Sequence, residues 1–139
     1  MHRSPRHRPG FSLPELLIAL AMIGILSAIT GPRIGEALRR HALDGAAQRL
    51  ALDMKRAQSE AVKRNRNVSL TRVGLTGYSV DGGPATVFSD QVAFTSASPA
   101  TVTFASFGPP TTGSATMTLQ RATVSKTVRV SATGRVSIQ

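Results

Sequence analysis

Residues 11–30 form the most apolar stretch of the chain, and Glu15 is their only charged side chain. As an α-helix, the 19 residues from Phe11 to Ile29 would be about 28 Å long, close to the roughly 30 Å hydrocarbon core of a bilayer. We therefore expect a transmembrane helix at 11–30. The basic segment before it, residues 1–10, is predicted to stay on the cytoplasmic side.

A second apolar pattern follows Gly31-Pro32. Proline removes a backbone donor and clashes with the preceding turn, so we expect a kink there. Residues 31–66 then continue as an amphipathic helix, because apolar side chains recur at spacings of three and four. These positions are Leu43, Ala47, Leu50, Met54, Ala57 and Ala61. The stripe predicts packing against a β-sheet of the same chain, with a partner helix as the alternative.

From residue 67 onward the pattern changes to short alternating runs separated by Gly, Pro and Asp. Such runs predict β-strands joined by turns. In the later strands, Val128 and Val130 should face inward and Arg129 outward. The expected strands are Val68–Val73, Tyr78–Val80, Thr86–Ser89, Val92–Thr95, Thr101–Phe107, Ala115–Gln120, Thr127–Ala132 and Val136–Ile138. The predicted fold class is α+β, a long N-terminal helix packed on a C-terminal antiparallel β domain at 67–139.

Charge and composition narrow the class of protein. The chain has 17 Lys and Arg against 7 Asp and Glu, a net charge of +10. Without the three arginines of residues 1–10, 14 basic and 7 acidic side chains remain, a net charge of +7. A basic domain favours anionic neighbours such as acidic proteins, lipid headgroups or nucleic acid. The absence of cysteine excludes disulfides and thiolate metal sites.

The junction between the basic segment and the apolar run carries the most specific motif. Gly10-Phe11 is followed, four residues on, by Glu15, an arrangement that resembles the class III signal of type IV prepilins and type II secretion pseudopilins. The resemblance implies that prepilin peptidase cuts between Gly10 and Phe11 and that Phe11 becomes N-methylated. An ordinary secretory signal is the alternative, but 27–29 make a poor small-x-small cleavage site and Glu15 interrupts the apolar core.

Glu15 needs a physical reason, because an acid within a membrane helix costs about 2.5–3.5 kcal/mol on insertion scales. In a filament, an unpaired carboxylate among bundled helices would be strongly unfavourable. The amine of a neighbouring subunit's Phe11 could neutralise it, so the resemblance implies a role for Glu15 in assembly. The alternative is that Glu15 merely favours a helix start, worth about 0.3–1 kcal/mol.

Two further stretches resemble the GspH/FimT family of minor pseudopilins and pilins. One is the helix end and first strand within 52–70, which contains Ala57-Gln58-Ser59-Glu60-Ala61; the other is Val128–Val136. Some pilus-side members end in Gly-Arg-x-Arg, proposed to contact DNA. Here Gly134-Arg135-Val136 is followed by Ser137, so the second arginine is missing.

Catalytic chemistry is poorly supported. His41 is the one histidine after residue 10, and no Ser-His-acid grouping, phosphate loop or metal-ligand spacing is present. Asp81 and Asp90 could suggest calcium, but the ion takes 6–8 oxygen ligands, and acids in such segments are usually turn residues. We therefore expect no enzyme activity, no catalytic residues, no cofactor and no metal.

The sequence is best interpreted as a minor pseudopilin of a type II secretion system, at or near the tip of its filament. The resemblance implies other minor and major pseudopilins, prepilin peptidase and the inner membrane as partners, with the β domain in the periplasm. The alternative is a minor pilin of a type IV pilus that serves DNA uptake. Its DNA contacts would be Arg129 and Arg135, within a basic group that also includes Arg121 and Lys126. A solvated sheet face is the simpler interpretation of these residues.

Overall fold

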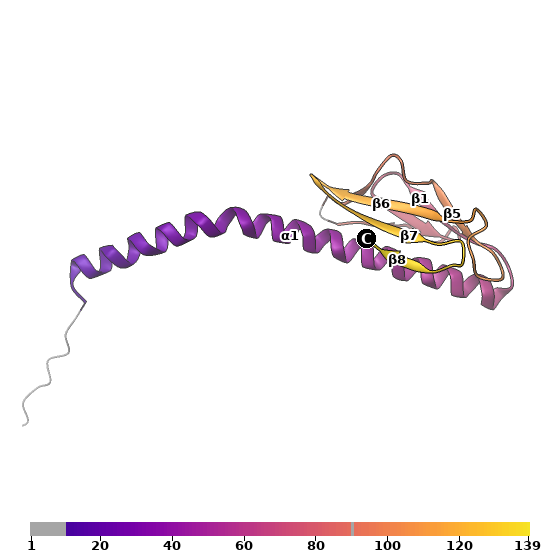
Figure 1. Ribbon diagram of the computed structural model, residues 1–139, viewed down its shortest axis with the longest axis horizontal. Helices are drawn as coiled ribbons and strands as arrows, with labels where there is room; N and C mark the ends of the chain where they lie inside the picture. Colours follow the sequence, from indigo (N-terminus) through magenta and orange to yellow (C-terminus); the bar gives the residue numbers. More distant parts are fainter. Residues whose placement is uncertain (1–10, 90) are drawn as a thin grey trace, which may run out of the picture. The chain divides into compact units, whose positions relative to one another are not determined.

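The computed structural model describes residues 11–89 and 91–139, with the side chains at positions 29–33 left out. It divides into an N-terminal unit, Met1–Ala37, and a C-terminal unit, Leu38–Gln139. A single helix, α1 (Leu13–Arg64), runs through both units (Figure 1). The α+β fold class predicted from the sequence is confirmed.

The helix begins where the sequence allows its first turn to form. The Leu16 N–H donates to the Ser12 carbonyl at 3.2 Å, and Pro14 lies in the first turn, where its missing N–H costs little. Helical structure continues through Gly31-Pro32, and the kink stays a prediction because the side chains there are not described. In the described part of the chain, no helix combines the length and apolar character needed to cross a membrane. The transmembrane assignment of 11–30 likewise stays a prediction.

The helix ends at Arg64, within the predicted 31–66 segment, and a left-handed cap at Asn65 follows it. Asn65 has a φ of 49°, a conformation that asparagine tolerates better than most residues. The Arg66 N–H reaches the Ala61 carbonyl at 3.1 Å, and the Asn65 N–H reaches the Val62 carbonyl at 3.2 Å. These two bonds form a Schellman motif, which satisfies carbonyls at the helix end and turns the chain toward the first strand.

The β domain consists of two four-stranded antiparallel sheets. The first has the order β3-β2-β1-β5 and the second the order β4-β6-β7-β8. In Figure 1, β6 to β8 lie in front of β1 and β5, and the Leu38–Arg64 part of α1 runs along them. The bounds are β1 Val68–Val73, β2 Gly77–Val80, β3 Thr86–Val87, β4 Ala93–Phe94, β5 Thr101–Phe104, β6 Ala115–Arg121, β7 Val124–Val130 and β8 Val136–Ile138.

The predicted apolar stripe of the helix is the helical side of the core. All six of its residues are at most 1% exposed, and they form one cluster with the inward side chains of both sheets. Phe104, Val128 and Val130 are fully buried in this cluster, while Arg129 between the two valines is exposed. The stripe therefore packs on strands of its own chain, and the partner-helix alternative is wrong.

Two strands differ from the prediction by three residues at one end, and four others differ by one or two residues at an end. The strand expected at Thr101–Phe107 ends at Phe104, because the Gly108 N–H donates to the Ala105 carbonyl and closes a turn. The strand expected to start at Thr127 starts at Val124. It is joined to β6 by a two-residue turn in which Ala122 has a φ of 53°. Alanine is unusual at such a position, so no glycine marked the hairpin.

Candidate functional site

The apolar part of α1 in the N-terminal unit is exposed along its whole described length. In residues 11–28, ten large apolar side chains are each more than half exposed, from Leu16 at 55% to Phe11 at 84%. Soluble monomers seldom expose apolar patches larger than a few hundred Å². A helix that is apolar all round is normally buried by lipid or by other helices. This segment therefore requires lipid or other helices to cover its apolar surface.

Glu15 lies in the first turn of α1 and its side chain is exposed, like those of the apolar residues around it. An acid suits this position, since the first turn carries the positive end of the helix dipole. Phe11 lies one turn before Glu15 and outside the helix. The structure thus brings these two predicted residues to the same end of the helix, while Gly10 lies outside the described residues.

Arg129 and Arg135 lie together on the outer face of the β7–β8 ladder. Arg129 pairs with Ser137 in the register, and the Ser131 N–H donates to the Arg135 carbonyl at 2.9 Å. The two arginines are therefore diagonal neighbours on one face, within reach of a shared ligand. Arg121 and Lys126 instead interact with residues of α1. Arg121 donates to the Leu38 carbonyl at 3.4 Å, and Lys126 pairs with Asp44.

The tight turn between β7 and β8 fixes the position of Arg135. The Arg135 N–H donates to Ser131 Oγ at 3.0 Å, and Gly134 has a φ of 83°. A Cβ at Gly134 would lie 2.4 Å from Nε2 of Gln58. The left-handed backbone conformation favours glycine here, whereas the contact with Gln58 involves the end of a flexible side chain that can move aside.

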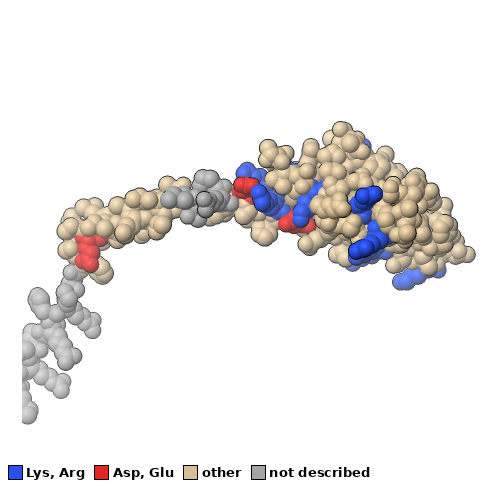
Figure 2. Space-filling view, viewed as in Figure 1, with Lys and Arg blue, Asp and Glu red and all other residues tan. Residues whose placement is uncertain are grey.

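The outer face around these arginines is rich in hydroxyl groups. Thr116, Thr118, Ser125 and Thr127 lie on the same face of β6 and β7 as Arg129, and Ser137 on β8 pairs with Arg129. None of the eight strands contains a carboxylate. Figure 2 shows the same imbalance, since Lys and Arg are more widespread than Asp and Glu on the visible part of the C-terminal unit. The charge on this face is therefore positive but dispersed.

The carboxylates described in the C-terminal unit are already paired with cations. Asp44 pairs with Lys126, Asp53 with Arg56, Glu60 with Arg64 and Asp81 with Arg66. At Asp81 both carboxylate oxygens accept from the Arg66 guanidinium, and this bonding lowers the pKa of Asp81 and raises that of Arg66. Asp81 is thus a partner of Arg66, and Asp90 lies outside the described residues. Within the described residues, no cluster of three or more His, Asp or Glu side chains could hold a metal.

A hydrogen bond that the sequence did not indicate joins α1 to the first sheet. The Tyr78 hydroxyl on β2 donates to Asp53 Oδ2 at 2.7 Å, and the ring is fully buried beside Phe88 and Phe94. Burial, and then the bond to Asp53, raises the pKa of the Tyr78 phenol well above its ordinary value. The hydroxyl therefore stays protonated at neutral pH and acts as a structural donor. His41 is exposed on the helix surface.

Comparisons with known proteins agree with this geometry. Residues 46–134 match the family described as Type II transport protein GspH, and residues 5–31 match the prokaryotic N-terminal methylation motif. Over 84 residues the chain is 37% identical to the pilin-like protein PilA1 of Thermus thermophilus, an alignment that covers 60% of this chain. The chain spans about half the length of that curated relative, 49%.

The fold is similar to crystal structures of the type IV minor pilin FimU of Pseudomonas aeruginosa. In one crystal form the TM-score is 0.63 at 19% identity, over 72% of this chain and 90% of FimU. In a second form the TM-score is 0.60 at 18% identity, over 70% of this chain and 92% of FimU. The methylation motif implies prepilin-type processing and anchoring through the N-terminus. The chain belongs to the GspH family and is a type IV pilin-like minor pilin or pseudopilin.

Proposed function

We propose that the chain is a minor pseudopilin of a type II protein secretion system, a structural subunit at or near the tip of the pseudopilus. The observation that carries this proposal is the exposed apolar helix from Phe11 onward, whose one acid lies at its start. Such a helix is stable in a bilayer before assembly and in a bundle of similar helices afterwards. The C-terminal unit then lies in the periplasm, and the helix is a single-pass anchor in the inner membrane.

Assembly depends on charge as well as on apolar area. A filament core excludes water, so Glu15 would enter it only with a cation. The N-methylated amine of Phe11 on a neighbouring subunit keeps its positive charge and supplies that cation. Pairing of this kind selects one axial offset between helices. The partners are then prepilin peptidase and the other minor and major pseudopilins.

The first test concerns processing. Mass spectrometry of the membrane-extracted protein should find a chain that begins at N-methylated Phe11, because the peptidase of this superfamily cuts after glycine. Gly10→Val should leave the leader attached, while Ser12→Ala should be processed normally. A mature terminus near Ala28, or an intact Met1 in the wild type, would exclude the prepilin assignment.

A second candidate function is DNA uptake by a type IV pilus, and one observation favours it. Arg129 and Arg135 lie as diagonal neighbours on a sheet face whose strands contain no carboxylate. FimU, which has the same fold, is a type IV minor pilin. Against strong binding, the strands around these arginines present hydroxyl groups and no aromatic side chain for base stacking.

The DNA alternative makes a separate prediction. Binding that rests on phosphate contacts weakens with salt, with a log–log slope of about −0.9 per contact for duplex. We expect weak binding near physiological salt, reduced equally by Arg129→Ala with Arg135→Ala and by the control pair Arg39→Ala with Arg40→Ala. A salt titration by fluorescence anisotropy measures both. Tight, salt-resistant binding lost only with the sheet arginines would make the DNA-uptake pilin the better assignment.

A further inference from the structure

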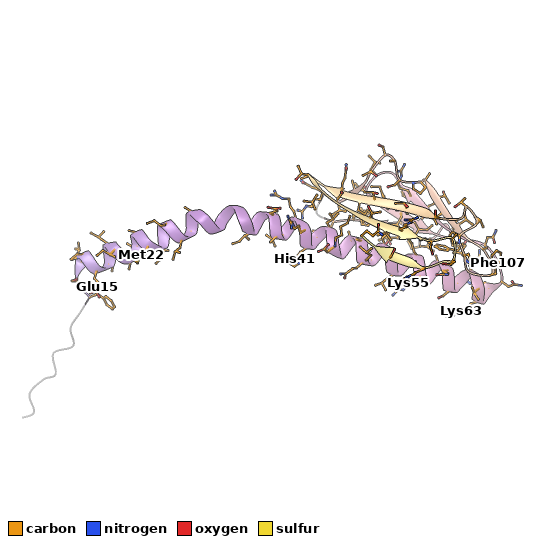
Figure 3. All side chains as sticks on the ribbon, in the orientation of Figure 1. Glu15, Met22, His41, Lys55, Lys63 and Phe107 are labelled. Atoms are coloured by element: carbon orange, nitrogen blue, oxygen red, sulfur yellow. The ribbon has the colours of Figure 1, made fainter. Side chains whose placement is uncertain are left out.

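An unused surface of the C-terminal unit lies on the side of α1 opposite the core. We call it the outer strip, and it consists of Leu52, Lys55, Ser59, Val62, Lys63 and the loop residue Phe107. The helical members recur at spacings of three and four, so they share one face. All six side chains are exposed. In Figure 3, Lys55 and Lys63 lie along the same side of α1, and Phe107 lies near the helix end.

Apolar area at both ends distinguishes the strip from an ordinary solvated helix face. Leu52 is 57% exposed, Val62 is 52% exposed and Phe107 is 77% exposed. Val62, Lys63 and Phe107 line one shallow hollow. Phe107 is the one exposed Phe or Tyr among the described residues 38–139, since Tyr78, Phe94 and Phe104 are buried and Phe88 is partly buried. Exposed aromatics with a neighbouring hollow are typical anchors of protein interfaces.

The backbone holds Phe107 in this exposed position. Gly108 has a φ of 108°, and a Cβ there would be 3.6 Å from both Gln58 and Val62 on the helix. The turn therefore packs against α1 immediately after Phe107 and directs the next residue inward. Because the loop is fixed on both sides, the ring is presented without the entropy cost that a mobile loop would add.

The charge of the strip is positive and has no internal partner. None of its six members is acidic, and within the described residues no carboxylate lies in an ion pair with Lys55 or Lys63. The two acids that adjoin strip members in the sequence, Asp53 and Glu60, already pair with Arg56 and Arg64. The two lysines are eight residues apart, or about 12 Å along the helix. The strip therefore offers two cations, two helical turns apart, next to an aromatic anchor.

We propose that the outer strip binds an acidic, amphipathic helix face of a different pilin-like subunit. Two carboxylates of the partner, spaced about two turns apart, would pair with Lys55 and Lys63, and an aliphatic side chain would enter the hollow beside Phe107 and Val62. The proposal rests on the proposed function as an assembling subunit. It adds the surface and the chemistry of the neighbour, which the apolar N-terminal helix does not specify.

The charges argue for a different chain over a second copy. The four carboxylates described in the C-terminal unit are already in ion pairs, so an identical copy would bring mainly cations to the strip. Like charges brought together across an interface cost several kcal/mol. Duplex nucleic acid and lipid headgroups fit less well, because their phosphates would pair with the two lysines but leave the aliphatic Leu52 and Val62 uncovered.

Site-specific photo-crosslinking in cells that express the full-length chain tests this proposal. A photoreactive amino acid replaces Phe107 or Lys55, and the control position is Thr116, which is exposed on β6. We expect crosslinks from both strip positions to another pilin-like protein, and the crosslinked peptide should carry two Asp or Glu residues six to eight positions apart. Lys55→Glu with Lys63→Glu should reduce the crosslink from Phe107 at least fivefold.

The outcomes separate this proposal from the proposed function. The matched control Arg39→Glu with Arg40→Glu, an equal charge reversal elsewhere on α1, should leave the crosslink unchanged. Crosslinks to an identical copy, to lipid or to nucleic acid would overturn the proposal, as would equal crosslinking from Thr116. If the strip gives no crosslink while incorporation into filaments still depends on Glu15, the proposed function stands and the strip is not its interface. If the wild-type chain is absent from filaments, the proposed function itself is overturned.

Discussion

Glu15→Ala is expected to abolish incorporation of the chain into filaments while leaving cleavage after Gly10 intact. Glu15 lies in the first turn of α1 and is exposed, and no cation among the described residues forms an ion pair with it. In a bundle of helices its carboxylate would neutralise a neighbour's Phe11 amine. The substitution would leave that amine buried and unpaired, at a cost of about 3–5 kcal/mol. This corresponds to a loss of at least about a hundredfold in subunit affinity.

Processing should be unaffected or faster, because the substitution removes a charge from an apolar segment. The measurement is the ratio of filament-associated to membrane-retained chain after shearing, together with the mass of the mature N-terminus. Glu36→Ala is the control, since it removes the same charge further along α1 and should retain incorporation. Normal incorporation of Glu15→Ala would reduce Glu15 to a helix-start residue and would remove the charge-pairing part of the proposal.

The parts of the fold that follow from local patterns could be predicted from the sequence. The helix stripe and the strands Val68–Val73 and Val136–Ile138 are as expected, because periodicity and turn residues determine them directly. The division into two sheets was not predicted. Strand order depends on contacts between residues far apart in sequence, which alternation alone does not encode.

Some residues of the candidate site could also be predicted from a local pattern, and others required the strand register. Gly10, Phe11 and Glu15 form a linear motif, so sequence alone could indicate them. The proximity of Arg129 to Arg135 required the register of β7 and β8, in which each arginine lies beside a serine of the other strand. The alternating pattern predicts a strand that includes Phe107. In the structure the strand ends at Phe104, and the turn that follows leaves the Phe107 side chain exposed.

Arg72 is a further position that its sequence context did not single out, and it joins the two sheets. It lies on β1 opposite Tyr78, in a row that faces inward, and it is partly buried. Its Nη1 donates to the Thr95 carbonyl at 3.2 Å and to the Ser98 carbonyl at 3.0 Å. Ser98 in turn is buried, and its Oγ bonds the backbone of Thr118 on β6. The guanidinium therefore fixes the loop that crosses from β4 in one sheet to β5 in the other.

Arg72→Met should lower the free energy of unfolding by about 2–3 kcal/mol, because charged hydrogen bonds to two carbonyls are lost and methionine supplies no donor. Urea denaturation of the detergent-solubilised full chain measures this, followed by the fluorescence of Tyr78. Tyr78 is the one tyrosine, and the chain has no tryptophan. The control is Arg56→Met, which removes a guanidinium whose side chain is 81% exposed and 3.3 Å from Asp53. That change should cost less than about 1 kcal/mol, as is usual for surface pairs. Equal effects of the two substitutions would show that the loop between β4 and β5 is held without Arg72.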